Sequence, residues 1–276
     1  MVSRLKDHFK YSKAHFMPEL PEVTYYKKYV DATALNQEII EVDPADSKIA
    51  QASKKEFEEA LLHQKLEKSH RHGKYLMLTI SNGKILVFHF GMSGSFEYIK
   101  HDKLPKYAYF TLIFSDNSGL CFTCPRKLGK VYLAQSLEAF KKEHQLGIDA
   151  MDLDLKSFQK LLSNKRGSIK GALLDQHLIA GIGNMYADEI LFQTKIHPNT
   201  GINQLSDEEI KALYKNVHPV LKTVIKSQTE ESLLPENYLT PHRKPNTACP
   251  NGNGKIKKIK VAGRSTYFCP ECQKEK

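Results

Sequence analysis

The first residues that could do chemistry follow an internal methionine, where the chain reads "MPELPE" from Met17. A proline at a chain start is a secondary amine with a pKa of about 8, so a neutral, nucleophilic fraction exists at neutral pH. Its attack on a sugar C1′ would give an iminium ion, an electron sink that drives elimination of the attached phosphate, with Glu19 moving protons. Pro18 can act in this way only if translation begins at Met17 and the methionine is removed. As an internal residue its nitrogen is an amide.

A second group of reactive side chains lies near the C-terminus. Cys249 opens "CPNG", and Cys269 and Cys272 form "CPEC". Two Cys-x-x-Cys knuckles that face each other across a hairpin hold zinc with four thiolates, but Gly252 stands where the fourth thiolate is expected. Three thiolates with a water or a histidine such as His242 could still hold zinc. The alternative is a hairpin that keeps its shape by packing alone.

Another Cys-x-x-Cys pair, Cys121 and Cys124, lies in a stretch typical of a β-strand, "LCFTC". Residues three apart on a strand point to opposite faces of the sheet. We therefore interpret these two as core or surface cysteines rather than as a metal or redox pair.

Three loops carry residues that suit phosphate or nucleic acid. In "LIAGIGNMYADEIL" two glycines precede Asn184 at an expected helix start, where backbone N–H groups can hold phosphate, although a plain turn has the same pattern. "HRHGKYL" places Lys74 in a basic stretch, for which a solvated loop is the ordinary interpretation. "FGMSGSF" sets Met92 between two glycines, where a methionine usually packs.

Length and charge limit the class of protein. The 276 residues suffice for two domains. Lys and Arg number 41 against 31 Asp and Glu, a formal charge of +10 that favours a polyanionic partner such as nucleic acid. No window approaches the run of about 18 apolar residues that a membrane span needs, so we expect no membrane partner. Five cysteines without a secretory signal favour a reducing compartment, and we expect a cytoplasmic protein.

Residues 1–17 are basic and lack the apolar run of a signal peptide. We interpret them as a leader or as a start codon assigned too early.

The expected secondary structure changes twice along the chain. "KYLMLTI" and "KILVFHF" flank an Asn-Gly pair, the strongest short hairpin signal, and "YAYFTLIF" and "LCFT" repeat the pattern, which predicts an antiparallel sandwich or barrel. From residue 154 the apolar residues recur at helical spacing, with a capping box formed by Ser206 and Glu209. The last 36 residues hold nine Lys or Arg against two Glu and predict a small basic hairpin over 255–268.

The order of these motifs resembles one family. "MPELPEV", "GKYL", "HFGMSG", "PRKLG", "LLDQHLIAGIGNMYADEILF" and "GRSTYFCPECQ" follow each other as in the formamidopyrimidine-DNA glycosylase and endonuclease VIII family, from Met17 to the C-terminus. The pairing of "PELPE" with "GMSG" is closer to the formamidopyrimidine branch.

The resemblance implies an α+β fold in three parts, with damaged DNA bent across the cleft between domains. We expect an N-terminal β-sandwich catalytic domain over 18–146, a helix-two-turn-helix domain over 153–240, and a zinc-ribbon-like β-hairpin, possibly without zinc, over 241–276.

The resemblance also assigns roles to residues. Pro18 resembles the nucleophile and Glu19 the acid/base, and Glu22 resembles a buried carboxylate that supports the first helix. Lys74, Asn184 and Arg264 would contact the phosphates around the lesion. Met92 would fill the space that the everted base leaves, and Arg126 would contact the partner base. Leu128 would insert between bases as the wedge. The metal ligands would be Cys249, Cys269 and Cys272.

The sequence departs from the family pattern at several places. Cys124 stands where an aspartate is usual, Leu128 where an aromatic wedge is usual, and Gly252 where a zinc thiolate is usual. A leucine can still intercalate between bases, so we expect a weaker wedge. The segment "SQTEESLLPENYLTPHRKP" matches the lesion-covering loop of known members poorly, and it gives no prediction of lesion preference.

The leading hypothesis is a base-excision-repair DNA glycosylase and AP lyase that removes 8-oxoguanine and formamidopyrimidines from duplex DNA. It would act as a monomer through an N-terminal proline Schiff base followed by β,δ-elimination. The first alternative is an inactive damaged-DNA or abasic-site binding protein of the same fold, with Pro18 blocked. The second is a zinc-ribbon nucleic-acid adaptor, which leaves "PELPE" unexplained.

Overall fold

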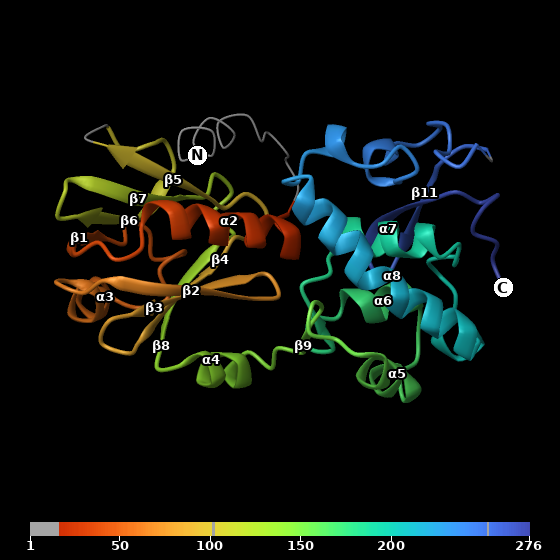
Figure 1. Cartoon of the computed structure of the whole chain (residues 1–276), viewed down its shortest axis with the longest axis horizontal. Coiled ribbons are helices and arrows are strands. Elements are labelled where there is room, and N and C mark those ends of the chain that lie inside the picture. The colour runs from red at the N-terminus through yellow and green to blue at the C-terminus, as the bar shows by residue number, and fades with distance from the viewer. Residues whose placement is uncertain (1–16, 101–102, 253) are drawn as a thin grey trace. The chain divides into compact units, whose positions relative to one another are not determined.

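The computed structural model describes residues 17–100, 103–252 and 254–276. The expected leader at 1–17 therefore lies, except for Met17, outside the described residues. The chain divides between Gln145 and Leu146 into two units, which we call the sheet unit and the helical unit (Figure 1). Within the described ranges, no helix combines the length and the apolar character needed to span a membrane.

The sheet unit contains two four-stranded antiparallel sheets. One has the order β1-β6-β7-β5 and the other β2-β3-β4-β8. The strands are β1 (Ile39–Asp43), β2 (Leu66–His72), β3 (Tyr75–Ile80), β4 (Ile85–His89), β5 (Ser95–Lys100), β6 (Ala108–Phe114), β7 (Ser118–Thr123) and β8 (Lys130–Ala134). Both predicted hairpins are confirmed, as β3–β4 and as β6–β7. In the first, Gly83 takes a φ of +87°, the left-handed conformation that an Asn-Gly turn requires.

Aromatic rings fill the space between the two sheets. The ring of Phe88 on β4 lies 4.9 Å from that of Phe96 on β5, 5.8 Å from that of Phe110 on β6 and 5.4 Å from that of Phe122 on β7. The pairs with Phe96 and Phe110 are edge-to-face, and the pair with Phe122 is tilted. Aromatic pairs of this kind add to the stabilisation that buried apolar area provides. The predicted N-terminal sandwich is therefore confirmed, and it forms the rigid base of the loops described below.

Three helices complete the sheet unit: α2 (Leu20–Thr33), α3 (Lys54–Leu61) and α4 (Leu137–Glu143). Val23 and Val30, one helical face of α2, are fully buried in the same core as the aromatic rings. This packing fixes the start of α2, and with it the residues just before the helix.

The helical unit has α5 (Leu155–Ser163), α6 (Ile169–Leu174), α7 (Asn184–Gln193) and α8 (Asp207–Lys226), with a short parallel pair β9 (Ile148–Asp149) and β10 (Ile179–Ala180). The predicted capping box is confirmed at the start of α8. The Glu209 N–H donates to Ser206 Oγ over 3.3 Å, and the Ser206 N–H donates to Glu209 Oε2 over 2.8 Å. The unit also contains three short 3-10 helices: η1 (Ile202–Gln204) before α8, and η2 (Glu231–Leu233) and η3 (Thr240–His242) after it.

The predicted C-terminal hairpin is confirmed as β11 (Lys257–Val261) and β12 (Arg264–Phe268). Ala262 and Gly263 form its two-residue turn with φ of +48° and +73°, as a type I′ hairpin turn requires. At the other end of the hairpin, Cys249 and Cys269 share a small core with Phe192 of α7. The hairpin therefore packs on the helices of its own unit.

Candidate functional site

Pro18 and Glu19 lie immediately before α2, and both are buried. Pro21 occupies the first turn of the helix, where a missing N–H costs nothing. The Glu19 backbone N–H donates to Glu22 Oε2 over 2.8 Å, which holds the chain at the helix entry. In a chain that includes Met17, the Pro18 nitrogen belongs to a peptide bond.

Glu22 supports the first helix, but it is half-buried rather than buried as the resemblance implied. The Glu22 carboxylate accepts the Glu19 N–H and therefore lies over the first turn of α2. The end of a helix is partly open to solvent, so a carboxylate in this position keeps some exposure.

Lys74 lies in a tight turn between β2 and β3, where His72 pairs with Tyr75. Gly73 provides the positive φ of +55° in this turn. Lys74 is half-buried and close enough to affect His89 on the adjacent strand β4. Burial, and then the positive charges of Lys74 and His144, lower the pKa of His89 to about 4. This histidine is therefore neutral at neutral pH.

Met92 lies in the loop between β4 and β5, which has little freedom. Gly91 has a φ of +58°, and a Cβ on it would overlap the backbone carbonyl of Leu128. Ser93 Oγ accepts the Arg126 backbone N–H over 3.1 Å. The Met92 loop therefore contacts the loop that carries Arg126 and Leu128.

Arg126 and Leu128 lie in the loop between β7 and β8, and both are exposed, Leu128 at 48%. Cys124 Sγ accepts the Gly129 N–H over 3.2 Å and so closes this loop. At its edge, Lys127 Nζ lies 2.7 Å from Asp46 Oδ2, which lowers the pKa of that carboxyl through a hydrogen bond. The structure thus places Met92, Arg126 and Leu128 on two loops in mutual contact.

The pair Cys121 and Cys124 is buried, in agreement with the interpretation as core cysteines. Burial raises the pKa of the Cys121 thiol to about 11, so this group stays protonated. Cys124 acts as a hydrogen-bond acceptor inside the loop that follows β7.

In the helical unit, Asn184 is the first residue of α7 and follows Gly181, whose φ is +116°. Its Nδ2 donates to the Ser265 carbonyl over 2.9 Å, although the two residues are 81 positions apart. Arg264 precedes Ser265 at the start of β12, and its side chain is exposed. The structure therefore brings the two predicted phosphate contacts of this unit together.

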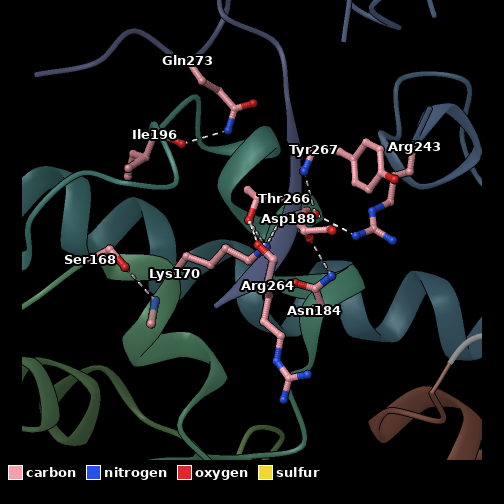
Figure 2. A network of polar contacts seen from close by, with 12 residues as sticks. Ser168, Lys170, Asn184, Asp188, Ile196, Arg243, Arg264, Thr266, Tyr267 and Gln273 are labelled. Carbon is pink, nitrogen blue, oxygen red and sulfur yellow. Dashed lines mark hydrogen bonds and ion pairs between the residues drawn. The ribbon is translucent and has the colours of Figure 1, made fainter. Parts of the chain in front are cut away.

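A buried ion cluster next to Asn184 was not predicted. Asp188 of α7 pairs with Lys170 of α6 and with Arg243, and its carboxylate also accepts the Tyr267 backbone N–H (Figure 2). The available signal was weak: an aspartate and a lysine that each interrupt an apolar helical stretch, "NMYADEILF" and "SIKGALL".

The three predicted metal ligands converge. The sulfur atoms of Cys249, Cys269 and Cys272 lie within 4.8 Å of one another, as the thiolates of a zinc site do. Gly252 turns the chain with a φ of +77° and offers no fourth ligand. His242, considered above as a fourth ligand, does not belong to this group among the described residues. The donor set fits zinc at three of its four positions.

Three family models match the chain in order. They are described as "Formamidopyrimidine-DNA glycosylase N-terminal domain" over residues 17–131, "Formamidopyrimidine-DNA glycosylase H2TH domain" over 146–233, and "Zinc finger found in FPG and IleRS" over 254–274.

Curated relatives carry the same description. The chain is 36% identical over 273 residues to a formamidopyrimidine-DNA glycosylase of Mycoplasma mobile, covering 93% of this chain and 99% of the relative. It is 32% identical over 275 residues to the formamidopyrimidine-DNA glycosylase of Streptococcus mutans, covering 94% of this chain and 100% of the relative.

Solved structures agree with these matches. The wild-type Lactococcus lactis protein in complex with N7-benzyl-Fapy-dG containing DNA superimposes with a TM-score of 0.85 at 28% identity, covering 94% of this chain and 100% of that one. The complex of the Lactococcus lactis protein with DNA that contains an abasic site superimposes with a TM-score of 0.84 at 29% identity. The match covers 93% of this chain and 100% of that one.

Proposed function

The chain belongs to the formamidopyrimidine-DNA glycosylase family, and we propose that this DNA glycosylase of base excision repair excises oxidised purines through the amine of Pro18. The observation that carries the proposal is the place where the family match begins, at Met17. Removal of that methionine, which is usual before a small residue, would leave Pro18 as a free secondary amine next to the buried Glu19.

The proposed reaction proceeds through an iminium ion. The neutral Pro18 amine attacks C1′ as the glycosidic bond breaks, and the bonding electrons leave with the base, which receives a proton relayed by Glu19. The proline nitrogen then loses its proton and the C1′–O4′ bond breaks, with O4′ taking up a proton, which opens the sugar ring and gives the iminium. The iminium withdraws electrons from the opened sugar, so that loss of a C2′ proton expels the 3′ phosphate, and a second elimination expels the 5′ phosphate. Hydrolysis of the iminium then restores the amine.

Lys74, Asn184 and Arg264 are the proposed phosphate contacts. Lys74 is fixed by its tight turn, and Arg264 extends from the tip of the hairpin. An amide nitrogen carries two protons, so the bond from Asn184 to Ser265 leaves one for a phosphate oxygen. These contacts offset the cost of turning the damaged nucleotide out of the duplex.

Met92, Arg126 and Leu128 are proposed to occupy the space that the turned-out base leaves. Their two loops are joined by the bond from the Arg126 N–H to Ser93 Oγ, so the three side chains would enter the duplex as one preformed group. The guanidinium of Arg126 suits cytosine as the partner base, and Leu128 is the apolar wedge.

Zinc is proposed to bind Cys249, Cys269 and Cys272, where it would cross-link the base of the hairpin. The net charge of +10 supports binding to duplex DNA. We further propose that the protein acts as a monomer, in the cytoplasm where the DNA of a bacterial cell lies.

Borohydride trapping tests the proposed function. It reduces an iminium to a stable amine, so a chain that begins at Pro18 should become covalently attached to an 8-oxoguanine:cytosine duplex. The chain that begins at Met1 should give no adduct, because its Pro18 nitrogen is an amide. A Pro18→Gly variant that begins at residue 18 should lose most of the adduct.

Pro21→Ala is the matched control, because Pro21 is a proline three residues further on, in the first turn of α2, and cannot become the chain start. It should trap as the parent chain does. Full trapping and strand cleavage by the chain that retains its first seventeen residues would contradict the mechanism.

A further inference from the structure

We propose that Asp188 is a positioning residue that fixes the strand of Arg264 against helix α7 and thereby sets Arg264 beside Asn184. The inference rests on the proposed function, in which these two residues hold the phosphates around the lesion. It concerns three further residues, Lys170, Arg243 and Thr266, which would act without contacting DNA (Figure 2).

The Asp188 carboxylate is at the centre of the cluster. Lys170 Nζ lies 2.6 Å from Asp188 Oδ1, and both side chains are 0% exposed. Arg243 Nη2 lies 2.8 Å from Asp188 Oδ2, with 9% of the Arg243 side chain exposed. The same Oδ2 accepts the Tyr267 backbone N–H over 3.1 Å. One carboxylate therefore joins α6, α7, the segment after η3, and β12.

Four consecutive residues of β12 are held by this cluster and by Asn184. Lys170 Nζ donates to Thr266 Oγ1 over 2.6 Å, and Thr266 Oγ1 donates to the Arg264 carbonyl over 3.1 Å. Asn184 Nδ2 donates to the Ser265 carbonyl over 2.9 Å. Ser265, Thr266 and Tyr267 are therefore each bonded directly to α6 or α7, and Arg264 is bonded to them through Thr266.

Arg243 adds a second contact to the same strand. Its guanidinium lies 4.9 Å from the centre of the Tyr267 ring, on the residue whose N–H the carboxylate accepts. Lys258 of β11 lies 5.8 Å from the same ring. Tyr267 is thus held by its backbone and by its ring, which fixes the rotation of β12 about its own axis.

Stability alone does not explain why three charges are buried here. Charges lose hydration when they are buried, and apolar residues of similar volume are often as stable or more stable in their place. Directional bonds of charged groups, in contrast, specify one arrangement. The strand they specify carries Arg264, so the cluster acts on the geometry of the phosphate contacts.

The cysteine group lies further along the same chain segment, after β12. Cys269 and Cys272 follow Phe268, so zinc would cross-link the base of the hairpin, whereas the ion cluster holds residues 264–267. Arg264 depends on the ion cluster more directly than on the metal.

A double-mutant cycle tests the proposal. The full chain beginning at Pro18 would be titrated with a duplex that contains a tetrahydrofuran abasic analogue, which it cannot cleave. Arg243→Met should weaken binding about tenfold, because loss of a charged hydrogen bond releases the strand. In the Arg264→Ala background, the same substitution should cost less than about twofold, because the residue it positions is gone.

Lys244→Met is the matched control. Lys244 is the neighbouring residue and exposed, so its substitution removes the same charge without touching Asp188. Its effect on binding should be small and equal in both backgrounds. Arg243→Lys should restore part of the lost affinity. Equal costs of Arg243→Met in the two backgrounds would overturn the proposal.

Hydrogen exchange separates this inference from the proposed function. Arg243→Met should speed exchange of the Tyr267 amide, while the amides of α8 remain as protected as in the parent chain. Unchanged Tyr267 exchange would refute the positioning role whether or not the enzyme is active. If the parent chain binds the analogue duplex no better than an undamaged duplex, the proposed function fails, and the exchange result still decides the structural part.

Discussion

The two units hold their proposed DNA-contact residues by different kinds of interaction. In the sheet unit, the loops of Met92 and Arg126 are held by a hydroxyl, a thiol and a glycine close to a backbone carbonyl, above an aromatic core. In the helical unit, the strand of Arg264 is held by a carboxylate and two cations that are buried. In the sheet unit, many weak neutral contacts share the work of holding the loops, so no single substitution should release them. In the helical unit, the ion cluster depends on one residue, Asp188, so a single substitution should have a large effect.

The largest expected effect is therefore at Asp188. Asp188→Asn leaves Lys170, which is 0% exposed, without its counterion, and should lower the free energy of unfolding by about 3–5 kcal/mol. Urea unfolding followed by far-ultraviolet circular dichroism would measure the loss. Replacing Lys170 and Arg243 by Met in the same protein should recover much of it. A loss below about 1 kcal/mol would show that the cluster is not buried in solution.

The stability of the sheet unit should fall in acid because of His89. Its pKa is lowered to about 4 by burial and then by Lys74 and His144, whereas an unfolded histidine titrates near 6.5. The unfolded state therefore binds more protons between these values, so stability is complete above about pH 6.5 and falls by up to about 3 kcal/mol as pH decreases to about 4. Urea unfolding at several pH values tests this, and His89→Phe should flatten the dependence in that window.

A smaller effect is expected for Arg264→Ala, which should weaken binding to abasic-analogue DNA by about tenfold and reduce the salt slope by about one phosphate contact. Fluorescence anisotropy at a series of salt concentrations would measure both. The free energy of unfolding should not change, since the side chain is exposed. An unchanged salt slope would argue against a phosphate contact.

The smallest effect is expected at the wedge. Leu128→Ala should slow excision by about fivefold, because an aromatic side chain stacked on a base contributes roughly 1–3 kcal/mol and the aliphatic wedge of Leu128 should contribute at the low end of that range. Leu128→Phe should make excision faster than in the parent chain, since an aromatic ring stacks better. Single-turnover rates on an 8-oxoguanine:cytosine duplex would compare the three proteins, and equal rates would remove Leu128 from the proposed site.

Local signals predicted most of the architecture. The Asn-Gly turn between β3 and β4, the Ser206 capping box and the C-terminal hairpin each depend on a few neighbouring residues, and the structure confirms them. The resemblance supplied the residues of the candidate site in the same way, because each belongs to a short motif.

Long-range contacts were not predictable from these patterns. Nothing in the sequence pairs Asn184 with Ser265, or Lys170 with Asp188, because the first pair forms only when β12 packs on α7 and the second only when α6 packs on α7. The degree of exposure of Glu22 and the absence of His242 from the cysteine group also depend on tertiary packing among the described residues. Sequence patterns indicated which residues matter, and packing determined which of them support one another.

The most direct test of the proposed chemistry is to find which residue carries the sugar. The trapped adduct of the chain beginning at Pro18 would be digested, and the modified peptide sequenced by mass spectrometry. The mechanism predicts the reduced sugar on the nitrogen of Pro18, in the peptide that begins with "PELPE". An adduct on a lysine such as Lys74, with an unmodified Pro18, would contradict it.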